Sequence, residues 1–523
     1  MRSKYGRVGK KERKKVSVRG GGTRRSLGQR LTGTERMRRE SLPMITMQPI
    51  FHGVETSEDK IFWKHYCITL SNVLTVEGEA KNAFKDIVLQ LATRHQGLMH
   101  SILALSSKHI DYDTPYGAKL LQDNLDISLE SLNQRSNYHQ EEAMKRFYDD
   151  IQKPEDKDDP EYKTVLSARY GQMLCLLLQT LAEGNPRGEH RVHLRAYKTL
   201  IQHSPPEDPV FLTFITEFFQ YHIYADELIW HPISGHKRLA SEEWIPPRVL
   251  SPPRLLGVAD GLFSYLSQIT TIRNNIRENM RLNTDPIVDF GTLYQASEID
   301  TALRAWMPQW PPGDSRDKVC LLYKQMMWVY LFRTIYPPCH TPHIELPSQP
   351  PSMLDPPQVH VEPHPEHPAS NPSSPVQQHR TGSSSLNPSR TNSLHEADLP
   401  GTPSRSDSSS PPPIRRPAQH DGRITLAVNE SLAIIESFKP SDPSQTILLI
   451  PCLVIGTSCF DPVQQDRVRV GVKCVKGYTG LRNCDCVLQV LEEVWRLMAL
   501  GEWVKVWDWQ GVAHEIGLDF LCT

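Results

Sequence analysis

A short cationic run near the start of the chain holds the side chains with the clearest chemical role. Lys10, Lys11, Arg13, Lys14 and Lys15 follow one another in the stretch KKERKK. Dense positive charge of this kind is recognised by nuclear import receptors, and it binds phosphate groups regardless of base sequence. We therefore predict nuclear import and phosphate contact for these five residues.

The positive charge of this region is also compatible with roles that do not involve the nucleus. Residues 1–40 contain 15 lysines and arginines against 3 glutamates, with few apolar side chains, so we predict a disordered basic tail. A mitochondrial presequence is also rich in arginine and poor in acids, but it should be amphipathic, and the three glycines at 20–22 disfavour a helix there. A solvated tail without a role, or an artefact of where the start codon was placed, would have the same composition.

The sequence contains none of the common catalytic or nucleotide-binding motifs. It has no G-x-S-x-G, no G-x-G-x-x-G, no glycine-rich loop ending in Gly-Lys-Ser/Thr and no H-E-x-x-H. His514 and Glu515 begin the last of these motifs, but the second histidine is absent. We therefore assign no catalytic, cofactor-binding or metal-ligating residue and expect a protein that is not an enzyme.

The acidic stretch at 149–161 has the composition of the aspartate motifs with which all-α isoprenoid enzymes bind Mg²⁺ and diphosphate. Those enzymes carry a DDxxD pattern and a second metal motif, whereas this stretch reads DDIQKPEDKDD and is broken by Pro154. We interpret it as a solvated loop between helices.

The cysteines and histidines suggest no better metal site. The ten cysteines include no C-x-x-C pair, and the spacings of six residues and of one residue in the C-terminal region do not suit zinc, which favours two to four. We predict free thiols in a reducing compartment, packed as small apolar groups. The thiols interpreted in this way are Cys67, Cys175, Cys320, Cys339, Cys452 and Cys474. The eight histidines at 340–420 lack an ordered scaffold, so we expect only weak adventitious metal binding there.

Apolar periodicity predicts that helices position most side chains of this protein. Phe84, Ile87, Val88 and Leu91 recur at spacings of three and four, and residues 165–181 are apolar nearly all round at their centre. Similar runs occur at 192–201, 211–230, 255–272, 296–306, 319–335, 424–438, 447–460 and 487–497. Strand-like alternation is confined to two short segments, 467–475 and 503–509. We therefore predict an all-α, multi-helix globular domain.

A change of composition interrupts these helices. From Pro337 to Gly422 apolar periodicity gives way to Pro, Ser and His, so we predict a disordered segment whose Ser-Pro pairs are candidate phosphorylation or partner-binding sites. The alternative for this segment is a passive spacer. Because helical patterns resume after it, we expect an insertion within one helical domain made of residues 61–336 and 423–523. A linker to a small terminal bundle is the other interpretation.

No segment of the sequence predicts a membrane span. The longest apolar run, Ile447 to Gly456, is about ten residues long and contains Pro451, so it is too short to cross a bilayer. Together with the absence of a signal peptide, this predicts a soluble intracellular protein.

Several of the helical segments occur in an order found in one protein family. They include FWKHYCITLSNVLTV (62–76), LMHSILALSSKHI (98–110), ILLIPCLVIGTSCFDPVQQDRVR (447–469) and TGLRNCDCVLQVLEEVWRL (479–497). This order resembles the fungal-specific transcription factor domain, which lies C-terminal to zinc clusters of the Zn2Cys6 type. The resemblance implies a regulatory domain controlled by a small-molecule effector, by intramolecular contacts, or by partners among other regulatory and transcription-machinery proteins.

The chain departs from this family at the DNA-reading module. That module carries six cysteines that bind two zinc ions, whereas the first cysteine here is Cys67, inside the helical body. Either the start of the gene model has been lost or the regulator acts without its own base reader. Zinc is therefore expected only if a missing N-terminal cluster exists, and DNA contact is expected through that cluster or through the basic tail, which does not read bases.

These expectations combine into a nuclear, non-enzymatic transcription regulator without membrane contact. One alternative is a helical interaction adaptor that does not touch DNA. Another is an all-α enzyme, which would need inward-facing paired carboxylates or a Cys/His pair in one pocket.

Overall fold

The computed structural model describes residues 52–77, 81–153, 157–240, 255, 257–258, 260–308, 310, 313–338 and 422–523. These residues form helices without any β-strand, apart from one isolated parallel bridge between Arg187 and Asp519. The all-α prediction is therefore confirmed. The predicted disordered tail and nearly all of the predicted Pro/Ser-rich segment lie outside the described residues.

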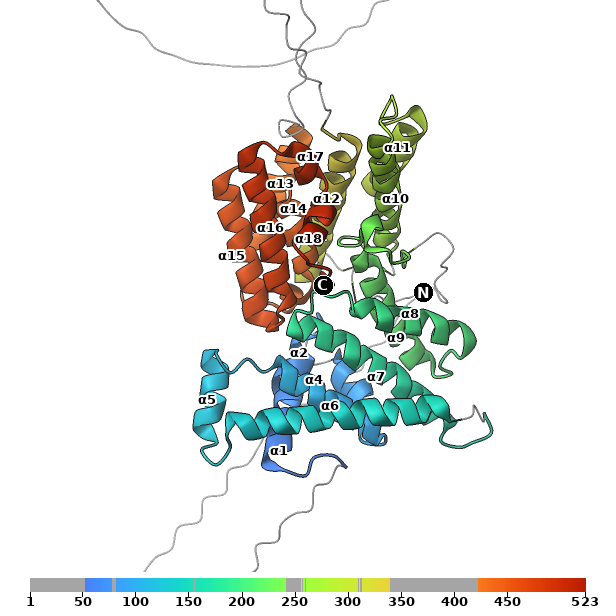
Figure 1. Ribbon diagram of the computed structural model, residues 1–523, viewed down its shortest axis with the longest axis vertical. Helices are drawn as coiled ribbons and strands as arrows, with labels where there is room; N and C mark the ends of the chain where they lie inside the picture. Colours follow the sequence, from blue (N-terminus) through green and yellow to red (C-terminus); the bar gives the residue numbers. More distant parts are fainter. Residues whose placement is uncertain are drawn as a thin grey trace, which may run out of the picture. The chain divides into compact units, whose positions relative to one another are not determined.

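Three successive groups of helices make up the described chain (Figure 1). The first comprises α1 (Ser57–His65), η1 (Tyr66–Leu70), α2 (Ser71–Val73), η3 (Phe84–Leu89), α3 (Gln90–Ala92), α4 (Gln96–His109), α5 (Pro115–Asp123), α6 (Leu129–Gln152), α7 (Tyr162–Glu183) and α8 (His190–His203). The second comprises α9 (Pro209–Asp226), η4 (Pro232–Ser234), α10 (Leu262–Arg281), α11 (Phe290–Ala305) and α12 (Ser315–Ile335). The third comprises α13 (Gly422–Glu436), η6 (Pro443–Ile447), α14 (Leu449–Gly456), α15 (Pro462–Thr479), α16 (Asn483–Leu500), α17 (Trp503–Trp507) and α18 (Trp509–Glu515).

Polar caps and prolines set where many of these helices begin. Thr56 and Asp59 form a capping box at the start of α1. Asp208 caps α9 by accepting a hydrogen bond from the backbone N–H of Val210, and Pro209 occupies the first turn, where no amide hydrogen is needed. The same Asp-Pro arrangement starts α15.

α4 and α7 form the buried centre of the first group. α7 buries every side chain from Ala168 to Ala182, as expected for a helix that is apolar nearly all round. α4 packs against both α6 and α7. The predicted central helix at 165–181 is therefore present, and neighbouring helices cover it on several sides.

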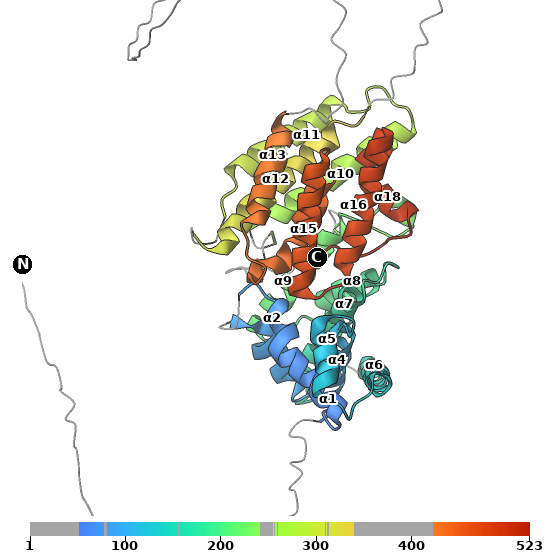
Figure 2. The same ribbon diagram turned by 90° about the vertical axis from the view of Figure 1, so that its left-hand side faces the viewer.

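α12 and α13 lie side by side although residues 339–421 separate them in the sequence (Figures 1 and 2). α12 also packs against α10, α11 and α14. α13 therefore packs against the helix that precedes the predicted Pro/Ser-rich segment in the sequence.

The two short segments of strand-like alternation, 467–475 and 503–509, do not form strands, in agreement with the all-α prediction. The first lies within α15, where Val468, Val472 and Val475 are buried at helical spacing while Val470 is exposed. β-branched residues favour strands only weakly, and packing of one helix face overrides that preference. The second segment forms α17 and the start of α18.

The acidic stretch at 149–161 is only partly a solvated loop. Asp150 lies in the last turn of α6 and is buried, with its carboxylate 3.0 Å from His95 Nε2 and 2.8 Å from Lys153 Nζ. Burial raises the pKa of Asp150, but hydrogen bonds from His95 and Lys153 outweigh this effect and lower it. The residues at 157–161 are exposed, in agreement with the loop interpretation.

The cysteines of the described residues are free thiols, and most are buried. The fully buried ones are Cys175, Cys320, Cys452, Cys459, Cys484, Cys486 and Cys522. Burial raises the pKa of each of these thiols. Cys67 and Cys474 are only half-buried, and Cys339 lies outside the described residues. Among the described helices none is long and apolar enough to cross a membrane.

Candidate functional site

The cationic side chains predicted to act in nuclear import and phosphate contact lie outside the described residues. The structure therefore does not place Lys10, Lys11, Arg13, Lys14 or Lys15. The buried polar features of the described chain include a pocket, a chain of histidines and a cluster around the C-terminal helices.

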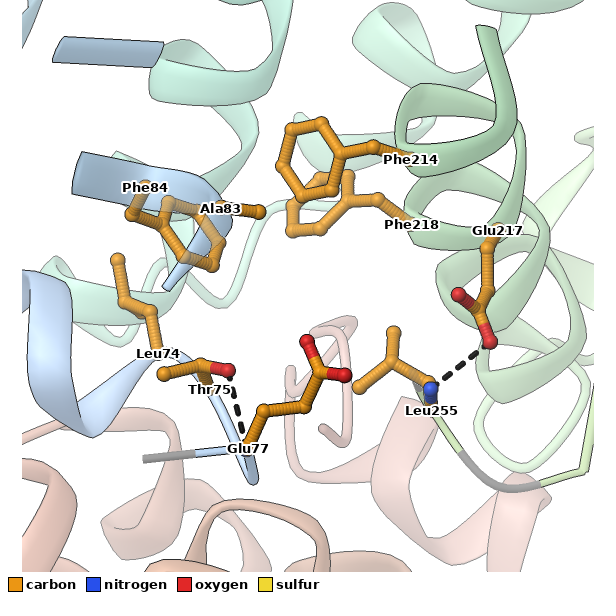
Figure 3. Close-up of a pocket in the computed structure, with 9 residues that line it drawn as sticks. All are labelled: Leu74, Thr75, Glu77, Ala83, Phe84, Phe214, Glu217, Phe218 and Leu255. Atoms are coloured by element: carbon orange, nitrogen blue, oxygen red, sulfur yellow. Dashed lines mark hydrogen bonds between the residues drawn. The ribbon is translucent and has the colours of Figure 1, made fainter. Parts of the chain in front are cut away.

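The pocket lies between the start of η3 and the middle of α9 (Figure 3). Its lining consists of Leu74, Thr75, Glu77, Ala83, Phe84, Phe214, Glu217, Phe218 and Leu255. Seven of these nine residues are buried, whereas Glu77 and Leu255 are partly exposed. The pocket therefore opens to solvent beside Glu77 and Leu255.

A buried asparagine shapes the wall that precedes η3. Asn82 Oδ1 accepts hydrogen bonds from the backbone N–H groups of Phe84 and Lys85, at 3.0 and 3.2 Å. Its Nδ2 donates to the carbonyl oxygen of Ser71 at 2.9 Å. These bonds tie the start of η3 to the start of α2, so that Phe84 and Leu74 line the same cavity.

Three phenylalanine rings form the apolar side of the pocket. Phe214 and Phe218 are one turn apart on the same face of α9, with ring centroids 6.3 Å apart. Phe84 packs edge-to-face against both, at centroid distances of 5.7 and 6.2 Å. Edge-to-face packing leaves electron-rich ring faces available to neighbours in the cavity.

Two carboxylates form the polar side, and among the described residues that line the pocket none is a lysine, arginine or histidine. Glu217 is 1% exposed, and its Oε1 accepts a hydrogen bond from the backbone N–H of Leu255 at 2.8 Å. The N–H of Glu77 donates to Thr75 Oγ1 at 3.2 Å, and the Glu77 carboxylate points toward the cavity (Figure 3). Both glutamates have a further interaction partner, so neither carboxylate is free.

The size of the pocket limits what it can enclose. Its volume is about 30 Å³, whereas one water needs roughly 10–15 Å³ measured in the same way. The cavity has room for about two waters or for one small head group, and a larger molecule would extend out past Glu77.

A chain of hydrogen bonds through two buried histidines joins the first group of helices to α15. His65 Nδ1 lies 2.7 Å from Tyr116 Oη, and His65 Nε2 lies 2.9 Å from His109 Nδ1. His109 Nε2 lies 2.7 Å from the carbonyl oxygen of Thr479. Because this carbonyl can only accept, His109 Nε2–H donates to it, and His109 Nδ1 then accepts from His65 Nε2–H. This arrangement suits two neutral imidazoles, with His65 Nδ1 accepting from the Tyr116 hydroxyl.

Protonation of His109 at Nδ1 would place its N–H against the N–H of His65 Nε2 and break this bond, and burial disfavours the charged form of both rings. Burial, together with the nearby His109, lowers the pKa of His65 to about 3. Burial also lowers the pKa of His109, despite the hydrogen bond to Thr479. Since both nitrogens of each ring are occupied, this chain holds helices together and is not poised for acid–base catalysis.

The C-terminal clasp, which we define as residues 507–511 with Arg273, surrounds a buried cation with aromatic rings. The Arg273 side chain of α10 is fully buried, and its guanidinium carbon lies 4.2 Å from a Trp507 ring centroid and 4.1 Å from a Trp509 ring centroid. Arg273 Nε donates to Gln510 Oε1 at 2.8 Å, and Nη2 donates to the carbonyl oxygen of Trp507. Burial lowers the pKa of Arg273 to about 9, which still leaves the guanidinium charged at neutral pH.

The two indole rings of the clasp also donate hydrogen bonds. Trp507 Nε1 donates to the carbonyl oxygen of Arg333 in α12 at 2.7 Å. Trp509 Nε1 donates to the carbonyl oxygen of Leu228, just after α9, at 3.2 Å. The clasp therefore attaches α17 and α18 to α9, α10 and α12.

Asp508 supplies the negative charge of the clasp. Its carboxylate lies 3.1 Å from His231 Nε2 and 2.6 Å from Arg277 Nη2, and it accepts from the N–H of Gly511 at the start of α18. Burial raises the pKa of Asp508, but hydrogen bonding to His231 and the charge of Arg277 lower it well below its usual range.

Sequence reasoning assigned no role to the residues of this pocket. The sequence of α9 does contain one indication of the pocket, because Glu217 is a lone carboxylate within the apolar stretch FLTFITEFF at 211–219. A single acid on an apolar helix can equally be capped by a backbone group or an arginine. Only the fold shows that Phe84 and Glu77 lie across a cavity from it.

Comparison with known proteins identifies the family. A family model described as the fungal specific transcription factor domain matches residues 60–381 and 410–523. No curated protein and no solved structure matches the chain. Because the model covers most of the sequence and its helical body has the predicted all-α fold, this chain belongs to the fungal-specific transcription factor domain family.

Proposed function

We propose that this protein is a nuclear, non-enzymatic transcription regulator whose helical body is the regulatory region. The single observation that carries the proposal is the family match, which runs through the body from residue 60 to residue 523 with one gap. In this role the body changes the output of a promoter by contacting regulatory or transcription-machinery proteins, and a small-molecule effector controls it through the pocket between η3 and α9.

The basic tail has two tasks in this proposal. Lys10, Lys11, Arg13, Lys14 and Lys15 serve as a nuclear import signal and add phosphate contacts that are sensitive to salt. Such contacts position a protein on DNA without selecting a sequence. Base reading would require a zinc cluster, and zinc is a cofactor only if such a cluster precedes the helical body.

A tethering experiment tests the regulatory role. The full chain is fused to a heterologous DNA-binding domain in a fungal cell that carries a reporter gene with the matching binding site. We expect reporter output to differ at least severalfold from that of the DNA-binding domain alone. Equal output from the fusion and from the DNA-binding domain, at matched protein levels, would contradict the proposal.

A helical interaction adaptor that does not touch DNA is the alternative function. Gel-shift titration with random duplex DNA at physiological salt distinguishes the two functions. The full chain is compared with a variant in which the five basic residues of the tail are replaced by alanine. Retarded DNA that disappears in the variant supports phosphate contact, whereas no retardation by either protein supports the adaptor.

A further inference from the structure

We propose that the outer side of α11 is a docking surface for a basic amphipathic helix of a partner protein. The surface, which we call the α11 face, consists of Phe290, Leu293 and Tyr294. This inference deepens the proposed function by giving the chemistry of one partner, and it rests on that function only in expecting the helical body to have partners. Exposed apolar side chains define the face, and the acids around it indicate the charge of the partner.

The α11 face is apolar and exposed. Phe290 is 88% exposed, Tyr294 is 67% exposed and Leu293 is 42% exposed. Because these residues are three and four positions apart, they lie on one side of the helix. Aromatic residues are enriched at protein–protein interfaces, and apolar side chains that are exposed together mark such interfaces.

The opposite side of α11 attaches the helix to the body. Ala296, Ile299 and Leu303 are buried on that side, and α11 packs against α10 and α12 (Figure 1). A surface helix needs one apolar stripe to pack on its own protein, and its other side is normally polar. α11 has apolar side chains on both sides, so the α11 face is not needed to hold α11 in place and is available to another protein.

The segment that carries the face is acidic. Residues 278–305, from the end of α10 to the end of α11, contain five acids, two arginines and no lysine. Both arginines are already bound to acids of the same segment. Arg281 Nη2 lies 2.6 Å from Glu278 Oε1, and Arg304 Nε lies 3.0 Å from Asp300 Oδ2. The charge that remains around the face is therefore negative.

The other three acids of this segment are exposed and form no ion pair with a described residue; they are Asp285, Asp289 and Glu298. Asp289 caps α11 by accepting a hydrogen bond from the N–H of Thr292 at 2.6 Å. Lysine or arginine side chains beside the apolar stripe of a partner would lie close to these carboxylates. Cations are also attracted to the ring faces of Phe290 and Tyr294. The charges and the rings therefore select a basic partner.

The helical form of α11 determines the shape of the partner. Its backbone groups are hydrogen-bonded within the helix, so a partner must bind to side chains and cannot extend a sheet. Rows of side chains on one helix pack into the grooves of another, and the apolar stripe of an amphipathic helix provides such rows. A second copy of this chain would bring the same acids to the interface, where like charges repel each other. We therefore assign the α11 face to a different protein.

Fluorescence anisotropy with labelled model peptides tests the proposal. The probe is a peptide of leucine and lysine of about 15 residues, roughly the length of α11, with its leucines on one helix face. One matched peptide has glutamate in place of lysine, and another has the composition of the probe with its leucines spread around the helix. At physiological ionic strength we expect saturable binding of the probe to the full chain and affinities about tenfold or more weaker for the matched peptides. Equal affinity for the basic and the acidic peptide would overturn the proposal.

Substitutions then locate the binding. We expect the affinity for the probe to fall about tenfold or more when Phe290→Ser and Tyr294→Ser are combined, and about two- to threefold in Glu298→Gln. Val470→Ser in α15 and Glu141→Gln in α6 remove an exposed apolar group and an exposed charge elsewhere, so these matched controls should bind as the unmodified chain does. Because all of these side chains are exposed, every variant should keep the unfolding temperature of the unmodified chain. Unchanged affinity in the double variant would overturn the assignment of the face.

Two further outcomes identify the occupant and separate this inference from the proposed function. Self-association of the full chain in sedimentation velocity that Phe290→Ser abolishes would overturn the partner assignment in favour of a second copy. A responding reporter together with no binding of the probe would overturn this inference alone. Probe binding that depends on the α11 face, together with a silent reporter, would contradict the regulatory role and support the docking surface.

Discussion

The pocket and the C-terminal clasp both bring aromatic rings together with charge, and they differ in what lies at the centre: a buried guanidinium in the clasp and a cavity in the pocket. In the clasp, Arg273 is enclosed by Trp507 and Trp509, and the polar groups around it are hydrogen-bonded. In the pocket, three phenylalanines and two glutamates are among the residues that line a cavity of about 30 Å³. Side chains fill the centre of the clasp, whereas an open space remains in the pocket.

This difference predicts unequal contributions to stability. A buried polar cluster with its hydrogen bonds made holds distant segments in one arrangement, and removing one member leaves the buried polar groups of the others without a partner. A partly exposed side chain at the edge of a cavity has fewer buried contacts to lose. We therefore expect substitutions in the clasp to lower stability more than a substitution at the rim of the pocket.

The largest effect should come from removing the cation of the clasp. Arg273→Met keeps much of the side-chain length but leaves Gln510 Oε1 and the Trp507 carbonyl without their donor. Loss of these bonds and of the two ring contacts should lower the free energy of unfolding by about 3–5 kcal/mol. Urea unfolding followed by tryptophan fluorescence measures this loss, with Arg281→Met on the exposed end of α10 as the control. A loss below about 1 kcal/mol would show that the clasp is not a source of cohesion.

Lowering the pH should remove the contribution of the histidine chain to stability before that of the clasp. The pKa of His65 is about 3 in the folded protein and about 6.5 in an unfolded chain. Its contribution is therefore complete above pH 6.5 and is lost as the pH falls toward 3, and by pH 4.5 about 2–3 kcal/mol should be gone. The lowered pKa of Asp508 keeps that carboxylate ionised over this range, so its contribution is lost only below about pH 4.

Unfolding free energies measured between pH 7 and pH 4.5 test this separation. The slope against pH should be clearly smaller in His65→Gln than in the unmodified chain. Parallel slopes in the two proteins would mean that His65 is not the group that takes up the proton.

A pair of glycines gives a smaller and more local test. A Cβ at Gly511 would lie 2.7 Å from Asp508 Oδ2, whose position is fixed by His231 and Arg277, so Gly511→Ala should cost about 1–2 kcal/mol. Gly477 lies in α15 with open space around it, so Gly477→Ala should be neutral or should stabilise the protein by up to about 1 kcal/mol. Shifts of the same sign and size in chemical denaturation would contradict the tight fit of the clasp.

The smallest effect on stability is expected at the rim of the pocket. Glu77→Gln removes one of two like charges while keeping the size of the side chain, so the free energy of unfolding should change by no more than about 0.5 kcal/mol. Differential scanning calorimetry of the variant and of the unmodified chain measures this change. A loss above about 2 kcal/mol would show that Glu77 supports the fold and would weaken the contrast with the clasp.

The sequence was informative wherever local pattern decides the structure. The spacing of Phe84, Ile87, Val88 and Leu91 predicts a helical segment, because it places apolar side chains on one helix face. The apolar run at 165–181 predicts a central helix, because a helix that is apolar nearly all round must be buried on all sides. Family membership was also accessible, because it depends on the order of many such segments. The alternation at 467–475 did not outweigh the helical patterns around it, and Val470 is an exposed valine between two buried valines of α15.

The candidate site depends on contacts between distant parts of the chain. Glu217 meets the N–H of Leu255 and lies across a cavity from Phe84, and no spacing rule connects these positions. His109 likewise finds its acceptor at Thr479, far along the sequence. The packing of the helices determines these contacts, and local sequence patterns do not specify that packing.

Urea unfolding of the full chain, compared between Arg273→Met and Glu77→Gln, tests the contrast between pocket and clasp most directly. We predict a loss of about 3–5 kcal/mol in Arg273→Met and a change of no more than about 0.5 kcal/mol in Glu77→Gln. Similar losses in the two variants would contradict this contrast.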